Sequence, residues 1–376
     1  MYRSLLSENP SEQVASALAR RSLILPVSRS PRREPTEENP SQSLSCSQYP
    51  FFLAEDYWEV VHLPAAPRSA DFDKTELFHL IRQTHSWLRG WVTRGHNPFI
   101  HPQLYRHQLP ECIQDAYTAV CAYVHKTPAT SSTALRIVCS RAAQIIQTYP
   151  ADASLDPSFS VVILDTFGHL ARTQALLVYQ FIRLYDGDIE ARARAEEDMD
   201  TLDDWARQMW ESAQLDVAAV NARPQDLDGA TIGGSDLNAF RVDHTPSSLW
   251  HAWILAESVH RTYLLAAYVQ QVYLTLKHGW SRCPGTVPFT MQMGLWDSPS
   301  GYSWYEACKA SSHKLFTSSL HSKDLFAQAG PEDIDEFTVT ALIATHGLDK
   351  IERWAGDKGG SFVIEMPREE QSAGLR

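Results

Sequence analysis

The stretch that decides the fold of this 376-residue chain is LARTQALLVYQFIRLYDGDIEARARAEEDMDTLDDW, residues 170–205. The apolar side chains of its first part follow two neighbouring helical stripes: Leu170, Leu177, Phe181 and Leu184 on one, and Ala171, Val178, Ile182 and Tyr185 on the other. A helix that is apolar around so much of its circumference must be buried inside a helical assembly. The stretch therefore predicts a central helix of an all-α domain.

The triplet Asp186-Gly187-Asp188 predicts the end of this helix. Gly187 tolerates the left-handed backbone conformation that ends a helix, and Asp188 is suited to cap the next one. The second helix is expected to be amphipathic, with Met199, Leu202, Trp205, Met209 and Trp210 on its apolar side. Two helices joined by a tight turn are the prediction for this stretch.

Helical spacing of apolar residues recurs along the rest of the chain. The predicted helices are one capped by Asp73, with Glu76 placed for a capping box, one after Pro110, one around 135–149, the longest from Pro246 to Gly279, and one from Pro331 to Gly347. Alternating apolar and polar residues are scarce, so a sheet is not expected.

The helices are predicted to form a single multi-helix regulatory domain over residues 49–356. Residues 1–48 are rich in Ser, Pro and Glu and have no regularly spaced apolar residues, which predicts a disordered N-terminal arm. Residues 357–376 are expected to form a flexible C-terminal tail. Residues 223–244, with three glycines, are expected to form a long polar loop.

Composition restricts the function classes. The apolar fraction of 44% is typical of a globular protein, and the net charge of −12 excludes a generally basic nucleic-acid binder. The six cysteines include no CxxC pair, so the sequence encodes no zinc finger or zinc cluster. No membrane span is expected, because Glu257, His260 and Arg261 interrupt the most apolar segment.

Acidic residues gather between residues 196 and 204 and invite a metal or acid–base interpretation. The carboxylates are Glu196, Glu197, Asp198, Asp200, Asp203 and Asp204. They lie opposite the apolar face of their helix, and no Glu-x-x-His spacing accompanies them. A solvated helix face is therefore the prediction.

By residue type, His96, His101, His107 and Cys112 form a set of metal ligands. Their spacing matches no zinc template, and the prolines among them predict an irregular loop, so ordinary loop histidines are expected. The glycines at 229, 233 and 234 do not form a dinucleotide fingerprint, and no P-loop or nucleophile elbow occurs. We predict no catalytic residue, no cofactor and no metal site.

Glu257 and Arg261 are four residues apart on the inward-looking face of the longest helix. This spacing predicts a buried structural ion pair, and the alternative is an anchor for an acidic ligand or partner. The basic clusters Arg20-Arg21 and 29–33 are candidate nuclear-import signals, and Ser28 and Ser30 beside them are candidate phosphorylation sites.

Several segments together resemble the fungal-specific transcription factor domain, the helical middle homology region of zinc-cluster regulators. They are 99–105 (FIHPQLY), followed by Leu109-Pro110 and the helix with Cys121 and Tyr123; 171–188, containing QALLVYQFIRLYDGD; 250–279, with Trp253, Glu257-Ser258 and Arg261-Thr262; 287–289 and 295–297, then Trp304; and 333–354, with Asp333, Asp335, Phe337 and Gly347. The resemblance covers roughly residues 49–354 and depends on the order and spacing of these segments.

The resemblance implies a fungal transcription regulator in the nucleus, with the cytoplasm also open, and a role in a secondary-metabolite gene cluster. Two features depart from the family: the first cysteine is Cys46, with no zinc cluster before it, and His260 precedes Arg261 where the family has two arginines. A missed upstream exon, a lost cluster and a co-regulator that acts through a DNA-binding partner are the three explanations.

The expected partners are other transcription regulators or the transcription machinery, contacted through helical grooves and aromatic patches, with no membrane contact. Either a homodimer or a heterodimer is compatible with the sequence. The alternative function is an intracellular small-molecule sensor or enzyme with an aromatic-lined cavity among its helices. The eleven tryptophans supply aromatic side chains for such a cavity, although most are expected in the core.

Overall fold

The stretch that opens the sequence analysis contains the most buried helix, α5 (Thr166–Tyr185), in which every residue from Leu170 to Tyr185 is buried. Asp165 caps the start of α5 by accepting a hydrogen bond from the backbone N–H of Gly168. After α5, Gly187 has a φ of +106°, and Asp188 accepts a hydrogen bond from the Ala191 N–H. The predicted turn and cap are therefore confirmed.

The computed structural model describes residues 50–62, 74–149, 164–222, 240, 245–310 and 316–362. The predicted arm over 1–48, the cap at Asp73, the glycines of the 223–244 loop and the basic clusters lie outside these residues. The described residues fall in one unit of the chain, residues 44–376. The predicted boundaries at 49 and 356 stay predictions.

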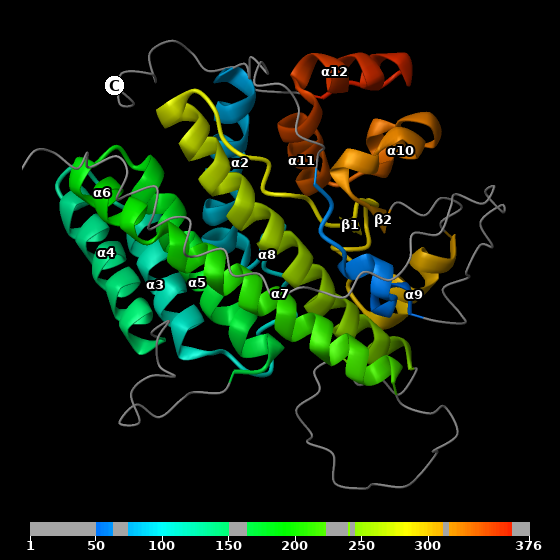
Figure 1. Ribbon diagram of the computed structural model, residues 1–376, viewed down its shortest axis with the longest axis horizontal. Helices are drawn as coiled ribbons and strands as arrows, with labels where there is room; N and C mark the ends of the chain where they lie inside the picture. Colours follow the sequence, from blue (N-terminus) through cyan, green and yellow to red (C-terminus); the bar gives the residue numbers. More distant parts are fainter. Residues whose placement is uncertain are drawn as a thin grey trace, which may run out of the picture. The chain divides into compact units, whose positions relative to one another are not determined.

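Helices surround α5 on several sides (Figure 1). Its neighbours are α3 (Glu111–Val124), α4 (Ser131–Thr148), α6 (Ile189–Glu197), α7 (Met199–Asn221) and α8 (Pro246–His278). The all-α prediction is confirmed, because eleven α-helices make up most of the described residues. Among those helices, none has the combination of length and apolarity that a membrane span requires.

The longest helix, α8, connects the α5 bundle to the C-terminal elements (Figure 1). The Thr245 side chain caps its start, and Gly279, with a φ of +76°, ends it as predicted. α8 contacts α5 and α7 as well as α2 (Lys74–Arg94), α9 (Gly301–Ala310) and β1 (Phe289–Thr290).

Eight shorter elements complete the described part of the fold. They are η1 (Phe51–Leu53), η2 (Glu55–Trp58), β2 (Phe316–Thr317), η3 (Ser319–His321), α10 (Lys323–Gln328), η4 (Pro331–Asp333), α11 (Glu336–His346) and α12 (Leu348–Asp357). β1 and β2 pair antiparallel, with Phe289 opposite Thr317. Apart from this pair, β-structure in the described part of the chain is limited to isolated bridges.

Two local predictions are wrong, each because a distant partner decides the backbone. The second helix of the decisive stretch breaks at Asp198 into α6 and α7, where the Asp198 carboxylate accepts from Arg183 Nη1 at 2.6 Å. Pro331 opens only the short η4, and α11 starts after its own cap, Asp335, which pairs with Arg261. Glu76 accepts from the Leu348 N–H at 2.8 Å, at the start of α12, and its predicted capping box with Asp73 lies outside the described residues.

The burial of α5 gives a first testable prediction. Leu176 is 0% exposed, whereas Leu215 on α7 is 72% exposed. We expect Leu176→Ala to lower the free energy of unfolding by about 2–5 kcal/mol, because it leaves a cavity between packed helices. Leu215→Ala is the matched control and should change it by less than about 0.5 kcal/mol. Urea denaturation followed by circular dichroism measures both, and equal losses would contradict the central place of α5.

Candidate functional site

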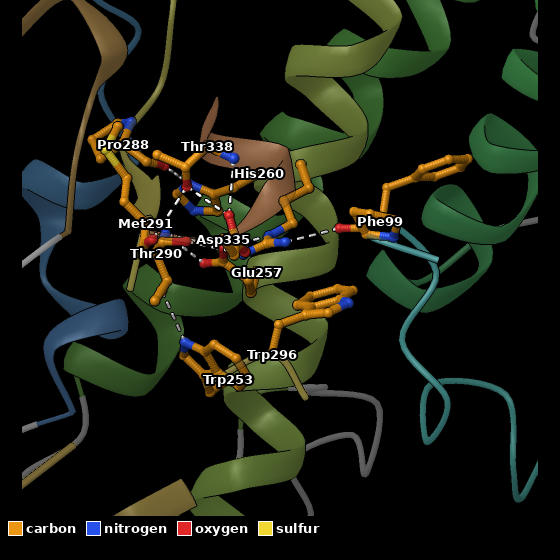
Figure 2. A network of polar contacts seen from close by, with 12 residues as sticks. Phe99, Trp253, Glu257, His260, Pro288, Thr290, Met291, Trp296, Asp335 and Thr338 are labelled. Carbon is orange, nitrogen blue, oxygen red and sulfur yellow. Dashed lines mark hydrogen bonds and ion pairs between the residues drawn. The ribbon is translucent and has the colours of Figure 1, made fainter. Parts of the chain in front are cut away.

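A polar network in the core surrounds the guanidinium of Arg261 on α8, and Figure 2 shows its acidic members Glu257 and Asp335. Arg261 Nε donates to Glu257 Oε1 at 2.8 Å, one turn earlier on the same helix. Nη1 donates to the Pro98 carbonyl at 3.0 Å, and Nη2 donates to the Thr290 carbonyl at 2.9 Å and to Asp335 Oδ2 at 2.7 Å. One side chain thus joins four segments that are distant in the sequence.

The two carboxylates of this network have further partners of their own. Glu257 accepts the backbone N–H of Thr290, at 3.0 Å to Oε1 and 3.1 Å to Oε2. Asp335 Oδ1 accepts from the Thr338 N–H at 2.9 Å and from the Thr338 hydroxyl at 2.6 Å, so the same carboxylate also caps α11. Each acid therefore has a structural role.

Aromatic rings enclose the guanidinium. Its central carbon lies 4.3 Å from the centre of the Trp296 ring and 5.0 Å from the centre of the Phe337 ring, within the range of cation–π attraction. Trp296 is itself held by a hydrogen bond from its indole N–H to the Asn97 carbonyl at 3.1 Å. Asn97 Oδ1 accepts from the N–H groups of Phe99 and Ile100, which shapes the loop that presents the Pro98 carbonyl.

In this network, burial and the neighbouring charges shift the pKa values of Glu257 and Arg261 in opposite directions. Burial raises the pKa of the Glu257 carboxyl, while Arg261 and the Thr290 amide oppose that rise. Burial also disfavours the charged form of Arg261, but the carboxylates of Asp335 and Glu257 outweigh it and raise the pKa of the guanidinium. The arginine stays charged because two acids surround it.

The Arg261 network is structural. Arg261 is 0% and Glu257 1% exposed, so no external carboxylate reaches the guanidinium without displacing core side chains. The predicted buried ion pair is present, and its fuller form includes Asp335. Three of the segments that carry the family resemblance, 250–279, 295–297 and 333–354, supply side chains to this network, and its two carbonyls come from Pro98 and Thr290, next to the segments 99–105 and 287–289.

His260, beside Arg261, occupies an aromatic enclosure. Its Nδ1–H donates to the Pro288 carbonyl at 2.5 Å (Figure 2). The ring centre lies 4.5 Å from that of Trp58, 4.9 Å from that of Trp210 and 6.0 Å from that of Phe316. Burial lowers the pKa of His260 to about 4, despite the opposing effect of the carbonyl.

Arg261 gives the second prediction. Arg261→Met leaves two buried carboxylates without their cation, so we expect the free energy of unfolding to fall by about 3–5 kcal/mol. Glu257→Gln retains an oxygen acceptor for the Nε–H and should cost less. Arg194→Met, which removes an exposed i,i+4 pair with Glu190, is the matched control and should cost under about 1 kcal/mol. Equal losses for Arg261→Met and Arg194→Met in urea denaturation would refute the structural role.

His260 gives the third prediction, through pH. Unfolded histidine binds a proton below about pH 6.5, whereas folded His260 binds one only near pH 4. The unfolded state therefore binds more protons between these values, and stability falls as the pH is lowered. From pH 7 to pH 5 this side chain should cost about 2 kcal/mol. His260→Gln should flatten the dependence, while His278→Gln, at an exposed position, should leave it unchanged.

The carboxylates of residues 196–204 are only partly a solvated face. Glu197, Asp200 and Asp203 are exposed as predicted. Glu196 instead accepts from the Tyr273 hydroxyl and from Lys277 Nζ on α8, and the bond from Lys277 is the main cause of its lowered pKa. With the ion pair of Asp198 and Arg183, these contacts hold α6 in the bundle.

The histidine set does not converge, although the irregular loop is as predicted. In the described residues, no group of three or more His, Cys, Asp or Glu side chains is arranged to hold a metal ion. His101 is no ordinary loop histidine, because it is 1% exposed and packs edge-on against Trp296 with ring centres 4.9 Å apart. Its Nδ1 accepts from the Gln103 N–H at 3.1 Å, and burial lowers its pKa to about 3.

The sequence interpretation missed the buried polar side chains of α5. Gln174 donates to the Phe99 carbonyl at 2.8 Å and to the Thr262 hydroxyl at 3.0 Å, and it accepts from the Tyr105 hydroxyl at 2.6 Å. This amide joins α5 to α8 and to the loop after Asn97. A buried glutamine among leucines was the available signal, since such a group must be hydrogen-bonded.

Two grooves lie on the surface of the described residues. The first, about 290 Å³, is lined by Leu104, His107, Phe167, His251 and Leu255 among others. The second, about 400 Å³, lies between η2 and α7 and is called the α7 groove below; its lining includes Trp58, Glu59, Arg207, Trp210, Glu211 and Tyr263.

Comparison with known proteins found one match that agrees with the sequence resemblance. No family model matches the chain, and no solved structure matches it. Over 265 residues the chain is 30% identical to the transcription factor gsfR2 of Penicillium aethiopicum. The alignment covers 70% of this chain and 58% of gsfR2, so the chain spans less than two thirds of that relative. The chain is thus similar to a fungal transcription factor over most of its own length.

Proposed function

We propose that this chain is a fungal transcription regulator that acts through contacts with other proteins. The observation that carries the proposal is the 30% identity to gsfR2 over 70% of the chain. The order of the segments that resemble the fungal-specific transcription factor domain supports the same function. We also propose that the chain contains this domain.

The architecture is compatible with a binding protein. The polar groups of the Arg261 network are buried and hydrogen-bond one another, so this cluster stabilises the fold. The surface of the described residues offers grooves between helices, and partner helices and peptides dock on such surfaces. We therefore propose a non-enzymatic role without a cofactor or metal.

Partners and location follow from the proposed function. No CxxC pair occurs in the 376 residues and the net charge is −12, so we assign base recognition to a DNA-binding partner. Other transcription regulators or the transcription machinery are the proposed partners, and the nucleus is the proposed location. Control of a secondary-metabolite gene cluster is the proposed role, and the sequence resemblance alone supports it.

The fourth prediction tests this function directly. The full chain is fused to a heterologous DNA-binding domain and expressed with a reporter gene that carries the matching operator. We expect at least a threefold change in reporter output, in either direction, relative to the DNA-binding domain alone. The Arg261→Met fusion, compared at equal protein level, should lose this effect because the fold is weakened.

Two outcomes would contradict the proposal. An unchanged reporter with a folded, nuclear fusion protein would argue against transcription regulation. Tight, sequence-specific shifts of promoter DNA by the purified chain at physiological salt would contradict recognition through a partner, because the chain would then read bases itself.

A further inference from the structure

The α7 groove has a wall of aromatic rings. Trp58 is the last residue of η2, Trp210 belongs to α7, and Tyr263 belongs to α8. The ring centres of Trp58 and Trp210 are 5.1 Å apart, and those of Trp210 and Tyr263 are 4.9 Å apart. The faces of such rings carry negative partial charge and attract cations.

The rim of the groove is acidic. Glu59 and Glu211 are exposed, and Asp204 lies one turn before Arg207 on α7. Arg207 is the cation in the lining, and it already pairs with Asp204 at 3.1 Å and with Glu211 at 3.0 Å. Among the lining residues, the carboxylates of Glu59 and Glu211 against the guanidinium of Arg207 leave one net negative charge, so the charge of the groove complements a cation.

From these two features we propose that the α7 groove binds a basic peptide segment of a partner protein. A lysine or arginine side chain meets the exposed carboxylates beside the aromatic wall. A nucleic acid would be repelled by the acidic rim. The inference rests on the proposed function only in taking the partner to be a protein.

The fifth prediction is a binding measurement on the full chain. A fluorescein-labelled peptide of alternating lysine and leucine is titrated at physiological salt, and fluorescence anisotropy reports binding. A second peptide, with glutamine in place of every lysine, should bind at least tenfold more weakly. The double variant Glu59→Gln/Glu211→Gln should weaken binding of the lysine peptide about fivefold, since each exposed charge pair contributes modestly.

A matched pair of exposed acids on α12 supplies the control. Glu352→Gln/Asp357→Asn removes the same charge at a different surface and should leave the affinity within about twofold of the wild type. An equal loss in this control would show general attraction to an acidic protein and overturn the groove. Absence of binding by the folded wild-type chain, or equal binding of the glutamine peptide, would also overturn it.

The peptide assay tests the groove and the reporter assay tests the proposed function, so their outcomes can be distinguished. Negative binding with an active tethered reporter rejects the groove and leaves the proposed function in place. Specific binding with a silent reporter supports the groove as a peptide site and argues against transcription regulation.

Discussion

One buried charge constrains the arrangement of most of this fold. Removing a guanidinium from water costs several kcal/mol unless its donors and its charge are both satisfied. Arg261 meets this demand only when the loop that carries Pro98, the strand β1 and the start of α11 are all in place around α8. Local pairing with Glu257 alone would leave Nη1 and Nη2 without acceptors. The network therefore couples elements that lie more than 160 positions apart along the chain.

This coupling gives a physical reason for the family resemblance to reside in scattered segments. Several of these segments, or residues next to them, supply parts of the same structure: a carbonyl from the loop at Pro98, an acid and the arginine from α8, an aromatic face from Trp296, and a cap from Asp335.

The sequence predicts the parts of the fold that local pattern controls. The body and end of α5 and both ends of α8 follow from helical periodicity, from Pro246 and from the glycines that end or separate the helices. The pair of Glu257 and Arg261 follows from its i,i+4 spacing. Asp335 was missed because Pro331 resembles a helix start, although the aspartate precedes Thr338 by three residues as an N-cap does. The carbonyls of Pro98 and Thr290 have no sequence signal, because every residue carries one.

The error at Asp198 comes from a long-range contact. A helical pattern reports only on contacts within its own segment, whereas the Asp198 carboxylate accepts a hydrogen bond from Arg183 on α5. A long-range partner of this kind shifts a helix boundary without changing the local composition. Boundaries and caps are thus where single-sequence reasoning is weakest, even when the helices themselves are correct.

The interior and the surface of the molecule differ in how their charges are balanced. Around Arg261, the positive charge of the guanidinium faces the buried carboxylates of Glu257 and Asp335. Among the residues that line the α7 groove, two carboxylates outnumber the one guanidinium, and this groove lies at the surface. A cationic group of a partner protein complements that charge. The core network therefore accounts for the fold, and the proposed peptide site depends on the charge of the surface.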